Sequence, residues 1–265
     1  MTKSLPLFLL FLLFSFPVSC QIGFPGGRIA YSCDGNQHDH DDFAATPMSL
    51  ALIKAAGLEK NLVHFDFSNH LGDNNIKMDS QMVVSAIGGA ERFGCEKSVF
   101  FDGQTQLEKA IANFKDEGDK SSEKNPLYYI CAGPMEVAWR CLNAVDPTKR
   151  KYIYVISHSD WNNNHSDTPQ MTHTWKDMPA LGVNVIDIID QNPGTNRPYE
   201  EYAWLRDSSN PLLNWLWERG NSTGKKKFDP SDAGMAYYLL TGGPKGGDEK
   251  CDPLKIKVIL EKLAK

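Results

Sequence analysis

The fold is decided by residues 28–56, which read RIAYSCDGNQHDHDDFAATPMSLALIKAA. Residues 28–33 form a short apolar run typical of a buried strand, and residues 43–56 have a helical pattern of apolar side chains. Between them lies a polar loop, residues 34–42, with four aspartates and two histidines. A strand, a polar loop and a helix in this order predict the first unit of a parallel β/α sheet.

The same alternation continues along the chain and predicts the fold class. After residue 190 the sequence indicates only loops and helices. We therefore expect an α/β fold with a doubly wound, mostly parallel, Rossmann-like sheet flanked by helices. A TIM barrel is excluded, because the last third of the chain supplies too few strands. The expected strands are 28–33, 62–67, 98–102, 127–131, 152–156 and 183–189, and the expected helices are 43–56, 82–93, 107–114, 135–144, 211–219, 232–240 and 253–264.

Composition narrows the class of protein further. The chain has 265 residues, of which 41% are hydrophobic and 23% charged, and this balance is typical of a globular protein. The formal net charge of −5 argues against a nucleic-acid binder, which needs a basic surface. We expect one domain over residues 21–265. The cysteines that follow residue 20 form no CxxC pair, and we expect Cys33 and Cys131 to be buried free thiols, with disulfides left open.

Residues 1–20 are expected to be a signal peptide. Lys3 is followed by an uncharged apolar run over residues 5–18, which is too short for a membrane-spanning helix, and then by small residues. Pro17 stands where a lipoprotein signal usually has Leu, so we expect cleavage in preference to lipid anchoring at Cys20. No other segment could cross a bilayer, and the sequence therefore predicts a secreted or periplasmic protein without a membrane span.

Polar side chains are concentrated after three of the expected strands, in residues 34–42, 68–75 and 157–165. The carboxyl ends of parallel strands meet at one edge of a sheet, where open α/β proteins bind their ligands. A solvated loop explains any one of these segments, but it explains the three together less well. We therefore expect a functional site at this edge.

The aspartates of residues 34–42 indicate a metal site. Four carboxylates so close in sequence repel one another unless a cation neutralises them. Oxygen ligands without cysteine favour Ca²⁺, and a zinc site using His38 and His40 is the competing interpretation. Asp41 and Asp42 also precede an expected helix, so helix capping accounts for one or two of the acids.

Three segments, in this order, resemble the nucleoside hydrolases and their nucleoside hydrolase-like relatives, the inosine-uridine-preferring nucleoside hydrolase superfamily. They are Asp34-Gly-Asn36 with Asp41-Asp42-Phe-Ala, then Ala132-Gly-Pro-Met-Glu136, and then Asp229-Pro-Ser-Asp232-Ala. The first looks like the family's Asp-rich loop with an insertion. The resemblance covers most of residues 28–240 and implies a nucleoside hydrolase-like fold.

The resemblance also implies roles for single residues. It implies that one Ca²⁺ is bound by Asp34, Asp42, the backbone carbonyl of Glu136 and Asp232, and that Asp41 is the base that deprotonates a metal-activated water. The insertion leaves the register open, so Asn36 competes with Asp34, and Asp229 with Asp232. Asn69 is implied to hold sugar hydroxyls, and Trp161 is expected to stack on a sugar or base. The full set of candidate substrate-binding residues is Asn36, His38, Asn69, His158, Trp161, Asn162 and Asn164.

The substrate half of the family's site is not retained. Glu136-Val137 replaces a Thr-Asn pair, Ser157-His158-Ser159 replaces a Gly-Gly turn, and the Glu-x-Asn element for the ribose 5′-hydroxyl has no counterpart. We therefore expect an exported, Ca²⁺-dependent hydrolase that cleaves an N-glycosidic or other glycosidic bond of a small-molecule glycoside or nucleoside-like substrate. The alternative is a non-catalytic carbohydrate-binding protein on the same fold. A metal-dependent phosphoesterase is disfavoured, because no second metal cluster is evident.

Two further expectations concern the surface. The run Lys225-Lys226-Lys227 is interpreted as a solvated loop. The sequence leaves the oligomeric state open, a homo-oligomer included.

Overall fold

A six-stranded parallel sheet in the order β3-β2-β1-β4-β5-β6 forms the centre of the protein. The computed structural model describes residues 23–36, 41–72 and 76–264. The expected signal segment 1–20 and the candidate residue His38 lie outside these residues. The strands are β1 (Arg28–Cys33), β2 (Leu62–Phe67), β3 (Phe100–Asp102), β4 (Leu127–Ala132), β5 (Ile153–Ser157) and β6 (Asn184–Asp187).

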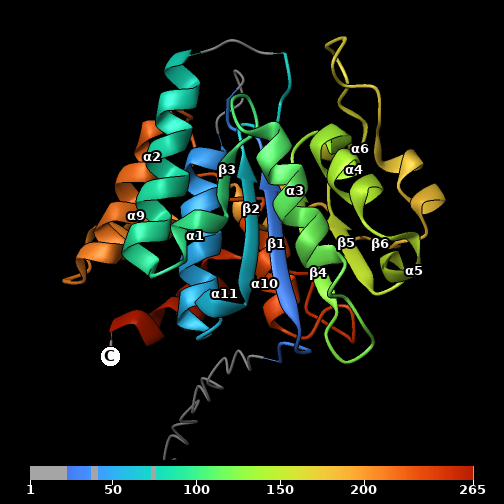
Figure 1. Ribbon diagram of the computed structural model, residues 1–265. Coiled ribbons are helices and arrows are strands. Elements are labelled where there is room, and N and C mark those ends of the chain that lie inside the picture. The colour runs from blue at the N-terminus through green and yellow to red at the C-terminus, as the bar shows by residue number, and fades with distance from the viewer. Residues whose placement is uncertain (1–22, 37–40, 73–75, 265) are drawn as a thin grey trace, which may run out of the picture.

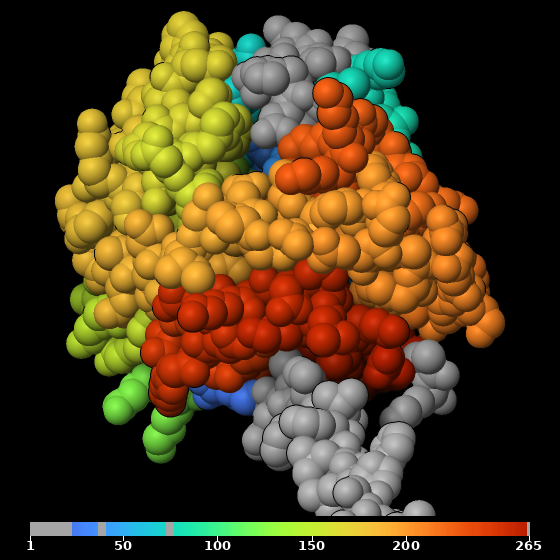
Figure 2. Space-filling view, turned by 180° about the vertical axis from the view of Figure 1, so that it is seen from behind, coloured from blue at the N-terminus to red at the C-terminus, as the bar shows by residue number. Residues whose placement is uncertain are grey.

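Helices cover both faces of this sheet (Figure 1). On one face, α1 packs against α2, α9, α10 and α11, and on the other face α3 packs against α4. In the view from behind, C-terminal segments coloured orange to red form much of the surface (Figure 2). The helices are α1 (Asp42–Ala55), α2 (Ile76–Phe93), α3 (Leu107–Gly118), α4 (Met135–Ala144), α5 (Pro147–Arg150), α6 (Asp160–Asn164), α7 (Asn192–Thr195), α8 (Ala203–Arg206), α9 (Pro211–Ser222), α10 (Ala233–Leu240) and α11 (Pro253–Leu260).

The apolar strands form because each is buried on both faces. All six residues of β4, LYYICA, are buried, as are the last five of β1. Alternate side chains of β1 enter opposite cores: Ile29 and Tyr31 pack with α1 and its neighbours, whereas Ala30 packs on the side of α3 and α4. The ring of Tyr31 stacks on Phe65, with centroids 5.0 Å apart. These strands therefore form a rigid platform under the loops that follow them.

The strand order places a topological switch point between β1 and β4. The chain moves from β1 outward to β2 and β3, returns to β4 on the other side of β1, and continues outward to β5 and β6. At such a point the loops after the two central strands diverge and leave a crevice beyond the carboxyl ends of the strands. The loops that begin at Asp34 and Gly133 border this crevice.

The structure confirms the predicted fold class, with every strand of the sheet parallel to its neighbours. The described cysteines are all buried free thiols, as expected for Cys33 and Cys131. Among the described residues, no helix has both the length and the apolar character that a membrane span requires.

Candidate functional site

A polar cavity of about 200 Å³ lies at the carboxyl edge of the sheet, where the loops after β1 and β5 meet the start of α10. Most of its lining side chains carry a carboxylate, an amide or a hydroxyl group. We call it the carboxylate cavity. It is lined by Asp34, Asp41, His158, Ser159, Trp161, Asn162, Asn192, Asn196, Lys225, Asp229, Ser231 and Asp232.

The end of β1 holds two aspartates against each other. The backbone N–H of Asp34 donates to Asp42 Oδ2 at 2.9 Å and lies 3.1 Å from the carbonyl of Ala132 on β4. Gly35 follows with φ of 75°, and a Cβ there would come within 2.5 Å of the sulfur of Met82 and 3.1 Å of the Asp42 Cβ. The turn therefore requires glycine, and it brings the first residue of α1 back beside the end of β1.

Asp42 is an electrostatically unfavourable carboxylate. It is fully buried, and burial raises its pKa well above the ordinary value. The neighbouring carboxylates of Asp34, Asp232 and Asp41 raise its pKa further. Its Oδ1 atom is buried and has no hydrogen-bond partner among the described residues. A group in this state is stabilised by a cation.

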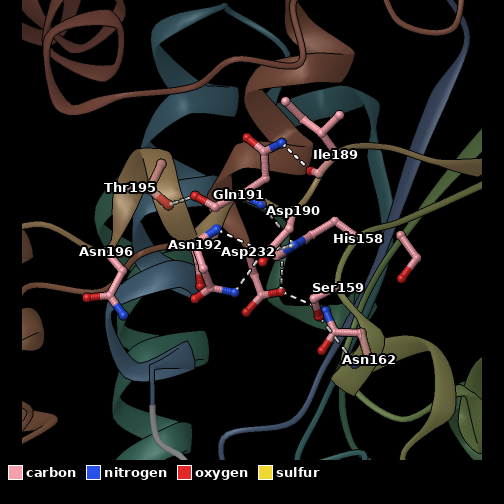
Figure 3. Close-up of polar contacts among 12 residues, drawn as sticks. His158, Ser159, Asn162, Ile189, Asp190, Gln191, Asn192, Thr195, Asn196 and Asp232 are labelled. Carbon is pink, nitrogen blue, oxygen red and sulfur yellow. Dashed lines mark hydrogen bonds and ion pairs between the residues drawn. The ribbon is translucent and has the colours of Figure 1, made fainter.

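Asp232, at the start of α10, lines the cavity, and Figure 3 shows its contacts with His158 and Asn162. Its Oδ1 atom lies 3.0 Å from His158 Nε2 and accepts a hydrogen bond from Asn162 Nδ2 at 2.8 Å. Burial raises the pKa of Asp232, but these hydrogen bonds and the charge of His158 outweigh it, and the pKa is lowered. Asp232 is therefore held as an anion.

His158 holds Asp232 and has both ring nitrogens engaged. Its Nδ1 atom lies 3.3 Å from the backbone N of Gln191, whose N–H it accepts when the ring is neutral, and 3.5 Å from Asp190 Oδ1, with which it forms an ion pair when the ring is protonated. Burial lowers the pKa of His158, but the carboxylates of Asp232 and Asp190 outweigh this effect and raise it above the ordinary value. We therefore interpret His158, a candidate substrate-binding residue, as a residue that orients Asp232.

Asp41 lies at the cavity with a partly exposed side chain. Ser231 donates to Asp41 Oδ2 at 3.5 Å, and Lys225 Nζ is 3.6 Å from the same atom. Lys225 also pairs with Asp229 Oδ2 at 3.1 Å. Burial raises the pKa of Asp229, whose Oδ1 atom has no hydrogen-bond partner in the described part of the chain. Both rival acids, Asp229 and Asp232, thus border the cavity.

Lys225 corrects one expectation. The run of three lysines was interpreted as a solvated loop, but the first of them lines the cavity between two aspartates. Nothing in the run itself distinguishes Lys225 from its neighbours. Ser159, from the predicted polar loop 157–165, lines the cavity. Asn192 and Asn196 also line it, and the sequence gives no sign of this because the segment around them carries no recognisable motif.

Several candidate residues are placed elsewhere. The side chain of Asn36 bonds both the N–H and the carbonyl of His70, and it is not part of the cavity lining. Asn69 is buried and donates to Ser32 Oγ at 2.8 Å. The exposed Asn164 donates to Asp160. Asn36 thus joins two loops, Asn69 joins a loop to β1, and the contact of Asn164 stays within α6. The roles of these asparagines in substrate binding stay predictions.

Glu136 is buried at the start of α4, with its side chain directed to the loop at residues 172–173. The carboxylate accepts hydrogen bonds from the backbone N–H groups of Thr172 and His173 and pairs with Arg140 at 2.7 Å. Burial raises its pKa, but these donors outweigh burial and lower it. The predicted role of its backbone carbonyl as a metal ligand is independent of the side chain.

The donor set fits a hard divalent cation. Ca²⁺ takes six to eight oxygen ligands, mainly from carboxylates and carbonyls. The cavity offers Asp34 and Asp232, with Asp42 close enough to both to perturb its pKa. The buried Oδ1 atoms of Asp42 and Asp229, without hydrogen-bond partners among the described residues, are the kind of atom that such a cation satisfies.

Comparison with known proteins shows a family. Over 253 residues the chain is 32% identical to the uncharacterized protein P22 of Formosa agariphila, an alignment that covers 89% of this chain and 92% of P22. The chain belongs to the family of P22. The name of P22 states no activity, so membership of the P22 family assigns no reaction. No protein-family model matches the chain.

A solved structure also aligns with the chain. The inosine-uridine preferring nucleoside hydrolase from Bacillus anthracis aligns with 89% of this chain and 99% of its own, with 11% sequence identity and a TM-score of 0.48. A likeness this distant carries no argument about the site. The nucleoside hydrolase-like roles implied by the motifs therefore stay predictions for this member of the P22 family.

Proposed function

We propose that the protein is an exported, Ca²⁺-dependent hydrolase that cleaves a glycosidic bond. The observation that carries the proposal is that Asp34 and Asp232, far apart in the sequence, line one cavity at the switch point of the sheet, with Asp42 close enough to both for its pKa to be raised. These carboxylates would hold the cation, with the carbonyl of Glu136 as a further ligand. Export rests on residues 1–20 and is tested by the N-terminal sequence of the secreted protein.

The chemistry divides between two kinds of carboxylate. When bound, the cation lowers the pKa of water and fixes its position. Asp41 differs from the buried Asp42 because its side chain is partly exposed at the cavity, where water and a substrate have access to it. We assign Asp41 the role of general base, which removes a proton from the attacking water. Ser231, 3.5 Å away, orients the Asp41 carboxylate.

The cavity also suits the transition state of glycosidic cleavage. Positive charge develops on the sugar ring as the bond to the anomeric carbon breaks. The carboxylates of Asp41 and Asp229 line the same cavity and are placed to stabilise this charge. The volume of about 200 Å³ is below the 300–1,000 Å³ typical of sites that enclose a drug-sized ligand, so we expect it to take a sugar ring and leave the leaving group outside.

The direct test is sugar release from a panel of nucleosides and p-nitrophenyl glycosides, assayed with Ca²⁺ and with EDTA. We expect turnover of at least one substrate in Ca²⁺, loss of turnover in EDTA, and recovery when Ca²⁺ is restored. Equal turnover in EDTA would refute the metal-dependent mechanism. Absence of turnover across the panel, with Ca²⁺ bound, would favour the second candidate below.

The second candidate is a non-catalytic carbohydrate-binding protein, and Lys225 is the observation that favours it. Its ammonium group partly neutralises Asp41 and Asp229 without a metal ion. The cavity would then bind sugar hydroxyls through its amides and carboxylates and activate no water. Glycan-array binding that is unchanged by Asp41→Asn, together with no turnover, would support this function over hydrolysis.

A further inference from the structure

A second group of metal-ligating side chains lies beside the carboxylate cavity. His70 Nε2 is 3.2 Å from His165 Nε2 and 3.0 Å from Asp167 Oδ1, and His165 Nε2 is 3.4 Å from Asp167 Oδ2. The ligand atoms of these three residues, which we call the histidine cluster, lie within 4.8 Å of one another. His70 and His165 are 95 positions apart, so no sequence spacing reveals the cluster.

We propose that the histidine cluster binds one Zn²⁺ or a chemically similar transition-metal ion. Zinc bonds to histidine nitrogen and carboxylate oxygen at about 2.0–2.2 Å, and in a tetrahedral site the ligand atoms are about 3.3 Å apart. The separations of 3.2 Å between the two Nε2 atoms and 3.0 Å between His70 Nε2 and Asp167 Oδ1 are close to two edges of such a tetrahedron. The other carboxylate oxygen, Asp167 Oδ2, lies 3.4 Å from His165 Nε2, so the carboxylate faces both rings. The half-exposed Asp167 leaves the fourth position toward solvent, where water can complete the coordination.

Hydrogen bonds account for at most two of these three contacts. Each Nε2 atom carries at most one proton, and the Asp167 carboxylate carries none when it is ionised. If only one of the two Nε2 atoms carries a proton, the lone pair of the unprotonated Nε2 atom faces the Asp167 carboxylate. With a proton on each Nε2, the two N–H groups can donate to the two oxygens of Asp167, but two donor nitrogens are then held 3.2 Å apart with no acceptor between them. A cation among the three residues makes all three contacts favourable.

The ligands are held in position by their surroundings. The backbone of His70 is fixed by the side chain of Asn36, which bonds both its N–H at 3.2 Å and its carbonyl at 3.0 Å. The ring of His165 stacks on Trp161 with centroids 4.2 Å apart and an angle of 17°. Because the site is largely pre-formed, metal binding requires little ordering of the protein.

The position of the cluster gives the ion a structural role. His70 follows β2, whereas His165 and Asp167 follow β5 and α6, and β1 and β4 lie between those two strands. The ion would therefore join two loops across the switch point, where Thr168 Oγ1 already donates to the carbonyl of Leu71 at 2.6 Å. Trp161 lines the carboxylate cavity, so the ion would also fix one wall of that cavity through His165.

Zinc titration by calorimetry tests the proposal, with chelator-treated protein in saturating Ca²⁺. We expect one Zn²⁺ per chain and tetrahedral visible absorption when Co²⁺ replaces it. Asp167→Asn and His165→Asn should each weaken Zn²⁺ binding by more than the roughly 10–100-fold that loss of an outer-shell partner costs. Both residues are partly exposed, so these variants should fold, and Asp207→Asn, at an exposed aspartate elsewhere, is the matched control.

The outcomes separate the two metal sites. Imidazole selects zinc over calcium, so Asp42→Asn should leave Zn²⁺ affinity unchanged, and Asp167→Asn should leave Ca²⁺ affinity unchanged. The proposal is overturned if the wild type binds no Zn²⁺, if Asp167→Asn and His165→Asn bind it as the wild type does, or if Asp42→Asn abolishes binding. The last result would assign the zinc to the carboxylate cavity.

Discussion

Replacing Asp42 by Asn should stabilise the metal-free protein, although Asp42 is fully buried. Burial and the nearby carboxylates of Asp34 and Asp232 disfavour its charge, as the raised pKa of Asp42 records. The amide keeps the shape of the side chain and the acceptor for the Asp34 N–H, now made at 2.9 Å to Asp42 Oδ2. It also turns an anionic oxygen into a donor that faces carboxylates.

The size of the stabilisation follows from the cost of the buried Asp42 Oδ1 atom, which has no hydrogen-bond partner among the described residues. An unsatisfied buried polar atom costs about 1–3 kcal/mol, so at pH 8 the variant should gain about this much without metal. For a chain of this size, each kcal/mol gained in the free energy of unfolding raises Tm by about 2–4 °C. Ca²⁺ at 100 times its Kd should add about 2.7 kcal/mol to the wild type. It should add almost nothing to Asp42→Asn, because a ligand is lost.

The assay is thermal unfolding in EDTA and in a Ca²⁺ series, with Asp66→Asn as the matched control. Asp66 is just as buried, but its carboxylate is paired with His64 and accepts hydrogen bonds from Ser32 and Tyr129. The same substitution there should destabilise the protein by at least about 2 kcal/mol. The reasoning is refuted if Asp42→Asn destabilises the metal-free protein as Asp66→Asn does, or if Ca²⁺ still stabilises Asp42→Asn fully.

Three further predictions address the base, the pH dependence and the loop at residues 172–173. Asp41→Asn should lower Ca²⁺-dependent kcat by about 10²–10⁴-fold with Ca²⁺ affinity nearly unchanged, and an unchanged kcat would remove Asp41 as the base. The pKa of Asp42 is raised above 3.8, so its stabilising proton is lost as pH rises through the folded-state value. The Tm of the metal-free protein should therefore fall as pH rises from about 4 to 8, by less in Asp42→Asn, and a flat wild-type profile would contradict this. Glu136→Gln should lower the free energy of unfolding, measured in urea, by about 2–4 kcal/mol, because Arg140 and the backbone N–H groups of residues 172–173 lose a charged acceptor. A loss below about 1 kcal/mol would show that these contacts do not stabilise the fold.

The fold was predictable because its central strands are short, mostly apolar runs that are buried on both faces. The runs RIAYSC and LVHFDF, residues 28–33 and 62–67, are the strands β1 and β2 with the same bounds. The edge of the sheet was less predictable. The run expected over 183–189 pairs only over Asn184–Asp187, where most side chains are exposed. Helix α2 begins at Ile76, whereas the prediction began it at residue 82. The prediction missed the first turns because their sequence is mostly polar and shows no apolar helical pattern.

The site was predictable where charge is concentrated in the sequence. Asp34, Asp41 and Asp232 line one cavity, with Asp42 beside them, although their roles stay predictions. The partners of these groups were not predictable, because contacts such as that of Lys225 with Asp41 join residues far apart in the chain. The histidine cluster was hidden for the same reason.

Anomalous diffraction from crystals grown with Ca²⁺ tests the central claim most directly. The account predicts one ion in the carboxylate cavity, with oxygens of Asp34, Asp42 and Asp232 at about 2.3–2.6 Å. Asp41 should lie within hydrogen-bond reach of a water on that ion. A cavity that contains no ion at a Ca²⁺ concentration that raises Tm, or an ion bound elsewhere on the protein, would contradict it.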